Sequence, residues 1–176
     1  MDYYSTIKIH DDLYYVGVND RHTHLFENMW PLEKGVTYNS FLMKGEKNIL
    51  IDSVQADKYE IYISKIKSVI GSDGKIDYLI VNHMEPDHSS SIELLLQAFP
   101  EMKLVGNAKT EDFIKAFYKI DTTGMFITVK DGETVKLGSE ELTFYTTPMV
   151  HWPESMVTYH EKTQTLFSQD AFGGFG

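Results

Sequence analysis

The sequence contains no cysteine. This absence excludes disulfide bonds, thiolate zinc sites and iron–sulfur clusters held by cysteine. Any metal ion must therefore be bound through nitrogen and oxygen atoms, so histidine and carboxylate side chains are the candidate ligands.

Positive charge and long apolar runs are also scarce. The chain has 16 Lys and Arg against 26 Asp and Glu, and its formal net charge is −10. Binding to nucleic acid needs clustered positive charge, so we expect no nucleic-acid partner. No apolar stretch approaches the roughly 20 residues that cross a bilayer. The start, Met1-Asp2-Tyr3-Tyr4-Ser5, lacks the basic and apolar regions of a signal peptide. We therefore expect a cytoplasmic protein with no membrane partner.

The chain has 176 residues, of which 42% are hydrophobic and 24% are charged, which predicts one globular domain. Helical periodicity predicts helices over 57–70, 89–99 (with a serine N-cap) and 110–119. Apolar runs predict strands at 6–9, 13–18, 38–44, 48–51, 78–82 and 103–106. Because strands and helices alternate from 48 to 119, we expect an α/β layer.

After residue 119 the pattern changes to short strands. They are predicted at 126–129, 133–137, 142–146, 155–159 and 165–168. Asp131-Gly132 is the clearest hairpin turn among them. The whole chain is therefore expected to form one compact α/β domain.

The stretch with most chemistry is His83-Met84-Glu85-Pro86-Asp87-His88, which directly follows the predicted buried strand 78–82. In an extended segment, residues two apart point the same way, so His83 and Glu85 could chelate one ion. Pro86 disfavours helix at Glu85 and keeps that segment extended. Asp87 and His88 are adjacent and need a turn, here the start of the next helix, to face a second ion. Two neighbouring metals are therefore a better fit than one.

Two further candidates follow other predicted strands. His151 comes after strand 142–146 and Asp170 after strand 165–168. Each could equally be an ordinary loop residue, but strand ends make convergence on one rim of a sheet plausible. Affinity order alone favours zinc over ferrous iron, whereas a ligand set rich in carboxylate shifts the preference towards iron or manganese.

These segments resemble the diiron domain of the flavodiiron proteins, also called A-type flavoproteins. The resemblance covers essentially the whole chain and rests mainly on 83–88, on His151-Trp152-Pro153-Glu154-Ser155-Met156, and on Leu166-Phe167-Ser168-Gln169-Asp170-Ala171-Phe172-Gly173. Supporting matches are Leu25-Phe26-Glu27, Tyr38-Asn39-Ser40 and Ile49-Leu50-Ile51-Asp52. The family implies a metallo-β-lactamase fold, an αββα sandwich of the α/β class. Hydrolases of that fold usually carry His where Glu85 stands.

The resemblance implies a role for each ligand. His83, Glu85 and His151 would bind one iron, Asp87 and His88 would serve the second, and Asp170 would bridge the two. The family reduces oxygen to water or nitric oxide to nitrous oxide. Its electrons come from FMN in a flavodoxin-like domain, and in the usual dimer the flavin of one subunit faces the diiron site of the other. Glu85 and Trp152 would lie on the flavin-facing side.

Two departures from the family pattern shape the expectations. The remaining iron ligand of the family is a histidine beyond the Asp170 motif, and residues 1–176 contain no flavodoxin-like domain. We therefore expect 1–176 to be roughly the first two-thirds of a metallo-β-lactamase-like domain. Its second half would be incomplete, either by truncation or because another chain completes it. His22, His24 or His160 could in principle replace the missing ligand, with His24 more simply a solvated loop residue.

Three functions follow as alternatives. The first is a diiron oxidoreductase supplied by FMN, a flavodoxin-like or a rubredoxin-like donor. The second is an oxygen-binding sensor, suggested by the absent flavin domain. The third is a dizinc hydrolase of the same fold, which Glu85 disfavours.

Overall fold

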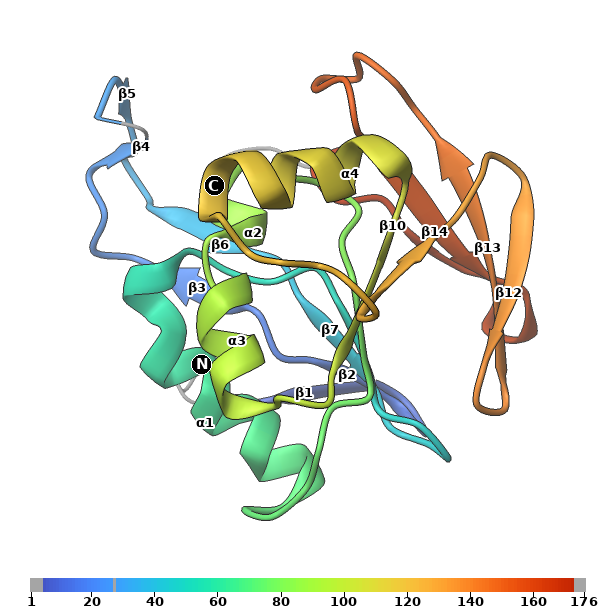
Figure 1. Cartoon of the computed structure of the whole chain (residues 1–176). Coiled ribbons are helices and arrows are strands. Elements are labelled where there is room, and N and C mark those ends of the chain that lie inside the picture. The colour runs from blue at the N-terminus through green and yellow to red at the C-terminus, as the bar shows by residue number, and fades with distance from the viewer. Residues whose placement is uncertain (1–4, 27, 173–176) are drawn as a thin grey trace.

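The computed structural model describes residues 5–26 and 28–172 (Figure 1). The expectations for Met1–Tyr4, Glu27 and Gly173 lie outside the described residues.

A mixed sheet of seven strands runs through the centre of the molecule, in the order β1-β2-β7-β8-β9-β10-β11. Strands β8 to β11 are parallel, whereas β1, β2 and β7 pair antiparallel. The seven strands are β1 (Ile7–His10), β2 (Leu13–Tyr15), β7 (Phe41–Met43), β8 (Ile49–Ile51), β9 (Tyr78–Ile80), β10 (Lys103–Gly106) and β11 (Phe126–Thr128).

Helices cover one face of this sheet (Figure 1). They are α1 (Tyr59–Ile70), the short α2 (Pro86–Ser89), α3 (Ile92–Ala98) and α4 (Ala108–Phe113), with a 3-10 turn at Ala56–Lys58 and a π-helical turn at Ile114–Tyr118. A further 3-10 turn, Glu161–Thr163, connects β14 to β15 of the second sheet described below. In α1 the apolar side chains at 62, 63 and 66 are buried against the sheet, as the helical period predicts. The helix ends at Gly71, whose φ of 87° is a conformation that favours glycine.

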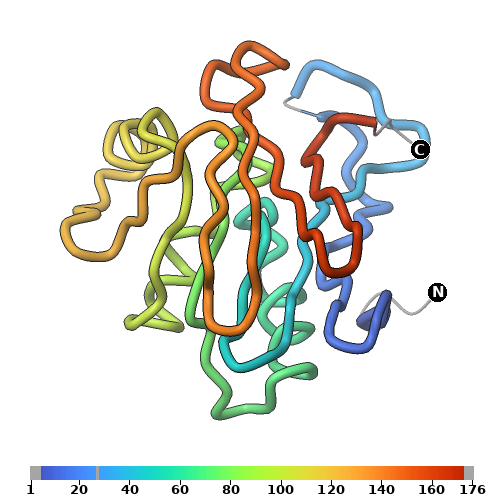
Figure 2. Tube along the Cα trace, turned by 90° about the vertical axis from the view of Figure 1, so that its right-hand side faces the viewer, coloured from blue at the N-terminus to red at the C-terminus, as the bar shows by residue number. Residues whose placement is uncertain are grey.

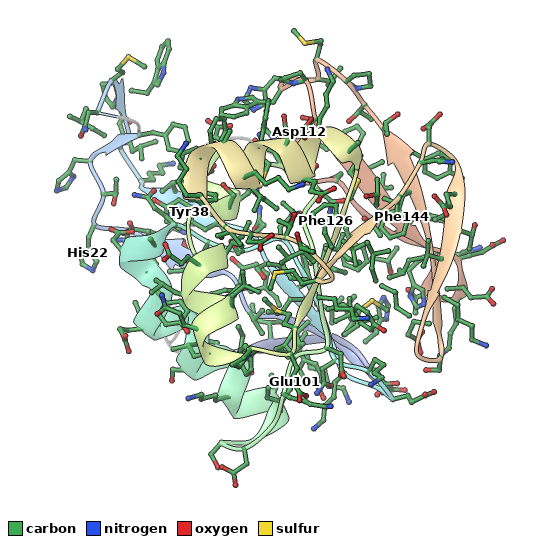
Figure 3. The ribbon with its side chains drawn as sticks, in the orientation of Figure 1. His22, Tyr38, Glu101, Asp112, Phe126 and Phe144 are labelled. Atoms are coloured by element: carbon green, nitrogen blue, oxygen red, sulfur yellow. The ribbon has the colours of Figure 1, made fainter. Side chains whose placement is uncertain are left out.

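A second, antiparallel sheet packs against the other face of the first. It consists of β12 (Glu133–Leu137), β13 (Glu140–Thr146), β14 (Met156–His160) and β15 (Thr165–Phe167). Phe144, fully buried and labelled in Figure 3, belongs to a core that joins residues of both sheets, including Ile51 and Ile80. The layers are thus helices, sheet and sheet, three of the four in the predicted αββα sandwich. Within residues 5–26 and 28–172, no α-helix covers the outer face of the second sheet.

Two predicted strands are each divided in two. Instead of single strands at 13–18 and 38–44, β2 and β7 lie in the large sheet, and β3 (Val18–Asp20) and β6 (Val36–Tyr38) form a separate pair. The chains cross closely here, because a Cβ at Gly17 would lie 2.2 Å from the carbonyl oxygen of Tyr38. The carbonyl of Ser40 accepts the N–H groups of both Val16 and Gly17 at 3.0 Å. This tertiary contact leaves no trace in local apolar patterning.

The predicted helix 89–99 and the Asp131-Gly132 hairpin are also corrected. Pro86 at the first helical position starts α2 earlier. Ser91 occupies the N-cap of α3 but makes no side-chain capping bond, while Ser89 and Ser90 donate to carbonyls of the preceding turn. Asp131-Gly132 connects β11 of the first sheet to β12 of the second, so it closes no hairpin. A small hairpin of β4 (Leu25–Phe26) and β5 (Trp30–Pro31) lies between β3 and β6, where the sequence predicts no strand.

The described helices include none that is long and apolar enough to cross a membrane.

Asp20 predicts an acid-dependent contribution to stability. Although burial alone would raise the pKa of this fully buried carboxylate, hydrogen bonds from Thr23, the His22 backbone and Lys58 lower it to about 2. The folded pKa is below the unfolded value of 3.8, so the stabilisation is present above pH 3.8 and is lost as pH falls towards 2. We expect Asp20→Asn to lower the free energy of unfolding at pH 6 by about 2 kcal/mol.

The measurement is urea unfolding of wild type and Asp20→Asn at a series of pH values. The difference between them should shrink below pH 4. The exposed Asp73 on the turn after α1 supplies a matched control, Asp73→Asn, with an expected effect under about 0.5 kcal/mol throughout. A difference that stays constant down to pH 2 would contradict the assigned pKa of Asp20.

Candidate metal centre

The 83–88 segment starts from a buried hydrogen-bond junction at Asn82. Its backbone N–H and side-chain amide donate to the two carboxylate oxygens of Asp52 at 2.8 and 3.1 Å. Thr158 of the second sheet donates to the Asn82 side-chain oxygen at 2.7 Å. Asp52 follows β8, so three strands from two sheets meet at the residue before His83. This junction fixes where the candidate ligands begin.

The segment that ends at Glu85 and the short helix α2 that follows it orient the candidate ligands, as the sequence predicts. Glu85 is extended, with ψ at 142°, and Pro86 begins α2. His83 and Glu85 point to the same place, with Nε2 and Oε2 3.2 Å apart. The turn of α2 carries Asp87 and His88, both buried.

A first donor group forms where loops from the second sheet meet this segment. Its atoms are Nε2 of His83, Oε2 of Glu85, Nε2 of His151 and Oδ2 of Asp170. His151 lies 3.2 Å from His83 and 2.9 Å from Glu85. Asp170 lies 3.2 Å from His151 and 3.4 Å from His83.

These separations fit one metal ion. Atoms bound at about 2.1 Å lie about 3.0 Å apart at right angles and about 3.4 Å apart in a tetrahedron. The side chains of His83 and His151 face each other through Nε2 at 3.2 Å, a contact that either a proton on one ring or a cation between the two nitrogens makes favourable. The donor set of imidazole and carboxylate suits iron, zinc or manganese.

A second donor group adjoins the first and shares Asp170. It contains Asp87, His88 and Asp170, with Oδ1 of Asp170 2.5 Å from Nε2 of His88. Each carboxylate oxygen of Asp170 therefore belongs to a different group. Oδ1 of Asp87 is buried and has no hydrogen-bond partner in the described part of the chain, which fits an acceptor kept for a cation.

The electrostatics of the cluster favour positive charge. Burial alone would lower the pKa of His83, but hydrogen bonds to three carboxylates raise it to about 11. Burial likewise opposes charge on His88, whereas Asp170 and Asp87 raise its pKa to about 9. Although burial would raise the pKa of Asp170, hydrogen bonds with His83 and His88 hold it well below its usual range. Burial raises the pKa of Asp87 to about 6.

The site is buried on one side and open on the other. His83 is fully buried, whereas the side chains of His151 and Asp170 are 56% and 39% exposed. The exposed pair lies on the loops that follow β13 and β15. The loop after β13 projects at the opposite end of the molecule from the turn after α1 (Figures 1 and 2). A pocket of about 420 Å³ reaches Glu85 and Asp87 from the side of Phe26 and Asp57.

Trp152 lies beside the first donor group. Its ring meets that of His83 edge-on, with centroids 5.5 Å apart. Phe113 of α4 packs on the other side of the indole at 6.4 Å. Trp152 thus fills the space between His83 and α4.

Three histidines named as substitute ligands are not brought to the site. Neither donor group in the described residues includes His22, His24 or His160. His22 lies at the outer edge of the molecule (Figure 3). His160, at the far end of β14, is bonded to Glu140 and Thr163. The alternative that one of them replaces the missing ligand therefore gains no support from the described residues.

Sequence reasoning assigned no role to two buried residues that hold the ligands. Asp52 supports Asn82, and Glu154 accepts hydrogen bonds from Nδ1 of His83 and from the Met84 N–H. A signal for Asp52 existed, because it follows the parallel strand next to the one that leads into His83. Glu154 gives no such signal, because its partner is 71 residues away.

The layered fold and the site at one end of its sheets define a metallo-β-lactamase-like domain, and comparison with known proteins agrees. Residues 36–176 match the model of the ODP family of β-lactamases. A nitric oxide reductase of Moorella thermoacetica is 36% identical over 169 residues, covering 95% of this chain and 42% of the relative.

Solved structures give the same result. The flavodiiron protein from Giardia intestinalis superposes with a TM-score of 0.90 at 30% identity, covering 99% of this chain and 42% of that one. The rubredoxin oxygen:oxidoreductase from Desulfovibrio gigas has a TM-score of 0.85 at 32% identity, covering 92% and 40%.

The chain belongs to the ODP family of β-lactamases, as a metallo-β-lactamase-like diiron domain of the flavodiiron type. It spans about two-fifths of the length of these relatives. The predicted family and fold class are therefore confirmed.

Asn82 should be essential to the stability of the frame that carries the site. Asn82→Ala leaves a carboxylate oxygen of Asp52 and the hydroxyl of Thr158 buried without partners, so we expect a loss of about 3 kcal/mol in the free energy of unfolding. Urea unfolding measures it. Asn48→Ala removes one surface hydrogen bond, from the Asn48 side-chain amide to the Lys75 carbonyl, and should lower the free energy of unfolding by less than about 1 kcal/mol. Equal losses in the two variants would contradict the central place of Asn82.

Proposed function

We propose that the chain is the diiron module of an oxidoreductase that reduces oxygen to water, nitric oxide to nitrous oxide, or both. The observation that carries this proposal is Asp170, whose two carboxylate oxygens belong to two different donor groups. A carboxylate shared in this way suits a pair of ions close enough to act on one small molecule. Similarity to a nitric oxide reductase and to a rubredoxin oxygen:oxidoreductase supports the two substrates.

The proposed ligand assignment follows the two groups. His83, Glu85 and His151 hold one iron, Asp87 and His88 hold the second, and Asp170 bridges them. Five donor separations of 2.9–3.4 Å support the first site. The second group has three donors among the described residues, so water or residues outside that part of the protein complete it.

The residues of the chain divide the chemical work between them. A ferrous pair supplies electrons and Lewis acidity to a diatomic ligand. The buried side chains of His83 and Glu85 are held by the packed protein around them, so their donor atoms stay aimed at one point. The exposed side at His151 and Asp170 leaves room for a substrate to enter.

Electrons come from outside residues 1–176 in this proposal. FMN in a flavodoxin-like domain, or a rubredoxin-like donor, supplies them, with Glu85 and Trp152 on the side that faces the flavin. The proposal takes residues 1–176 as the first two-thirds of the metallo-β-lactamase-like domain, acting as a homodimer or with another chain that completes it. A cytoplasmic location belongs to the same proposal.

Metal analysis of anaerobically purified protein tests the proposal. About two iron ions per chain, with consumption of oxygen or nitric oxide when a chemical reductant is supplied, is the expected result. Stoichiometric zinc without iron would instead favour a hydrolase. Stable oxygen binding without consumption would favour a sensor.

Asp170→Asn should lower the metal content of both sites, because one side chain serves two ions. The expected iron content falls from about two ions to less than one, measured by elemental analysis after dialysis. Asp87→Asn is the matched control, because Asp87 belongs to the second group alone and its loss should release one ion at most. Full iron content in Asp170→Asn would rule out the bridge.

A further inference from the structure

The Glu154 side chain joins the two halves of the candidate site from behind. It lies on the loop after β13 that also carries His151, and it is only 1% exposed. Its Oε1 accepts the Nδ1–H of His83 at 2.9 Å and the backbone N–H of Met84 at 2.8 Å. One carboxylate oxygen therefore holds both the ring and the backbone of the first ligand segment.

The bond to Nδ1 determines what the other ring nitrogen can do. A neutral imidazole carries one proton, so a hydrogen donated from Nδ1 leaves the lone pair on Nε2. That Nε2 faces Glu85, His151 and Asp170 at 3.2–3.4 Å. With the proton on Nε2 instead, His83 could not donate to an ion at that point.

Backbone contacts hold Glu154 itself in place. The side-chain amide of Asn107, which caps α4, donates to the Glu154 carbonyl at 2.6 Å. Two residues on, the N–H of Met156 donates to the carbonyl of Asn82 at 3.0 Å. The carboxylate is therefore presented from a fixed segment, and a shift in it would move His83 and His151 together.

The negative charge of Glu154 is not needed for its hydrogen bond with the Met84 N–H, since any carbonyl-type oxygen could accept it. Its second oxygen, Oε2, is buried with no hydrogen-bond partner among the described residues. A buried carboxylate is costly unless positive charge balances it. Among the contacts of its side chain, His83 is the group that can share positive charge, either as a proton or by donating to a cation.

We infer that Glu154 is the positioning residue for His83: it fixes the tautomer that presents Nε2 to the metal and strengthens the donation from that nitrogen. The inference rests on the proposed metal centre. It predicts a loss of metal affinity from a residue that does not itself belong to either donor group. Partners of this kind around metal-bound histidines contribute about 10- to 100-fold in affinity.

The chain offers a control in a second carboxylate–histidine pair. Nε2 of the buried His160 lies 2.9 Å from Oε2 of the partly exposed Glu140, the same length as the His83–Glu154 bond, at the far end of β14. Glu140→Gln removes the same charge beside a buried histidine without approaching the donor groups. It separates the loss of any histidine-bound carboxylate from the loss of Glu154.

The experiment compares zinc affinity in wild type, Glu154→Gln, Glu154→Leu and Glu140→Gln, by competition with a chromogenic chelator at one pH. Zinc is the probe because it needs no electron transfer. We expect about 10-fold weaker binding in Glu154→Gln, which keeps an acceptor, and about 100-fold in Glu154→Leu, which has none. Glu140→Gln should stay within about two-fold. In zinc-loaded protein, ¹⁵N NMR should show a strongly hydrogen-bonded Nδ1–H on His83 in wild type and not in Glu154→Leu.

Each result of this experiment either supports or contradicts the role of Glu154. Wild-type zinc affinity in both Glu154 variants would overturn the inference and leave the proposed function standing. Equal weakening in Glu140→Gln would also overturn it, since the effect would then be general. If Glu154→Leu does not fold, Glu154→Gln and the NMR signal of wild type decide instead. Wild type that binds neither zinc nor iron would end the proposed function, and the inference with it.

Discussion

The hydrogen bonds at Asn82 are the constraint on which the arrangement depends. Asp52 from the first sheet and Thr158 from the second both bond this one side chain, directly before His83. The packing of two sheets is non-directional, because apolar contact alone tolerates sliding. The buried Asn82 side chain donates to one sheet and accepts from the other, so sliding of the sheets would break a hydrogen bond. The sheets are thus locked in register at the point where ligands from both must meet.

Local chemistry explains how much of this could be predicted from the sequence. The His83–His88 motif was identified because its residues are adjacent, and α1 because its apolar period is regular. The roles of Gly17, Asn82 and Glu154 could not be predicted, because each depends on a partner distant in the chain. The divided strands and the crossing at Gly17 show the same limit, since a close approach of two backbones has no local pattern.

The candidate site concentrates negative charge that the protein alone does not neutralise. Glu85, Asp87, Asp170 and Glu154 lie around the three imidazoles of His83, His88 and His151, with no lysine or arginine paired to them in the described residues. Protons on His83 and His88 can compensate in part, as their raised pKa values indicate. Metal ions and protons therefore compete for the same nitrogen atoms, and metal affinity should fall in acid.

The short strand β15 sets the position of the shared carboxylate. It pairs with β14 through three residues, Thr165, Leu166 and Phe167, and Asp170 follows three residues later. Removing one residue from that connection would shorten its reach by up to about 3.4 Å, more than a metal–ligand bond length. Both donor groups would then lose the oxygen atom that Asp170 contributes to them. The spacing from Phe167 to Asp170 should therefore tolerate no insertion or deletion, although Asp170 itself lies at the surface.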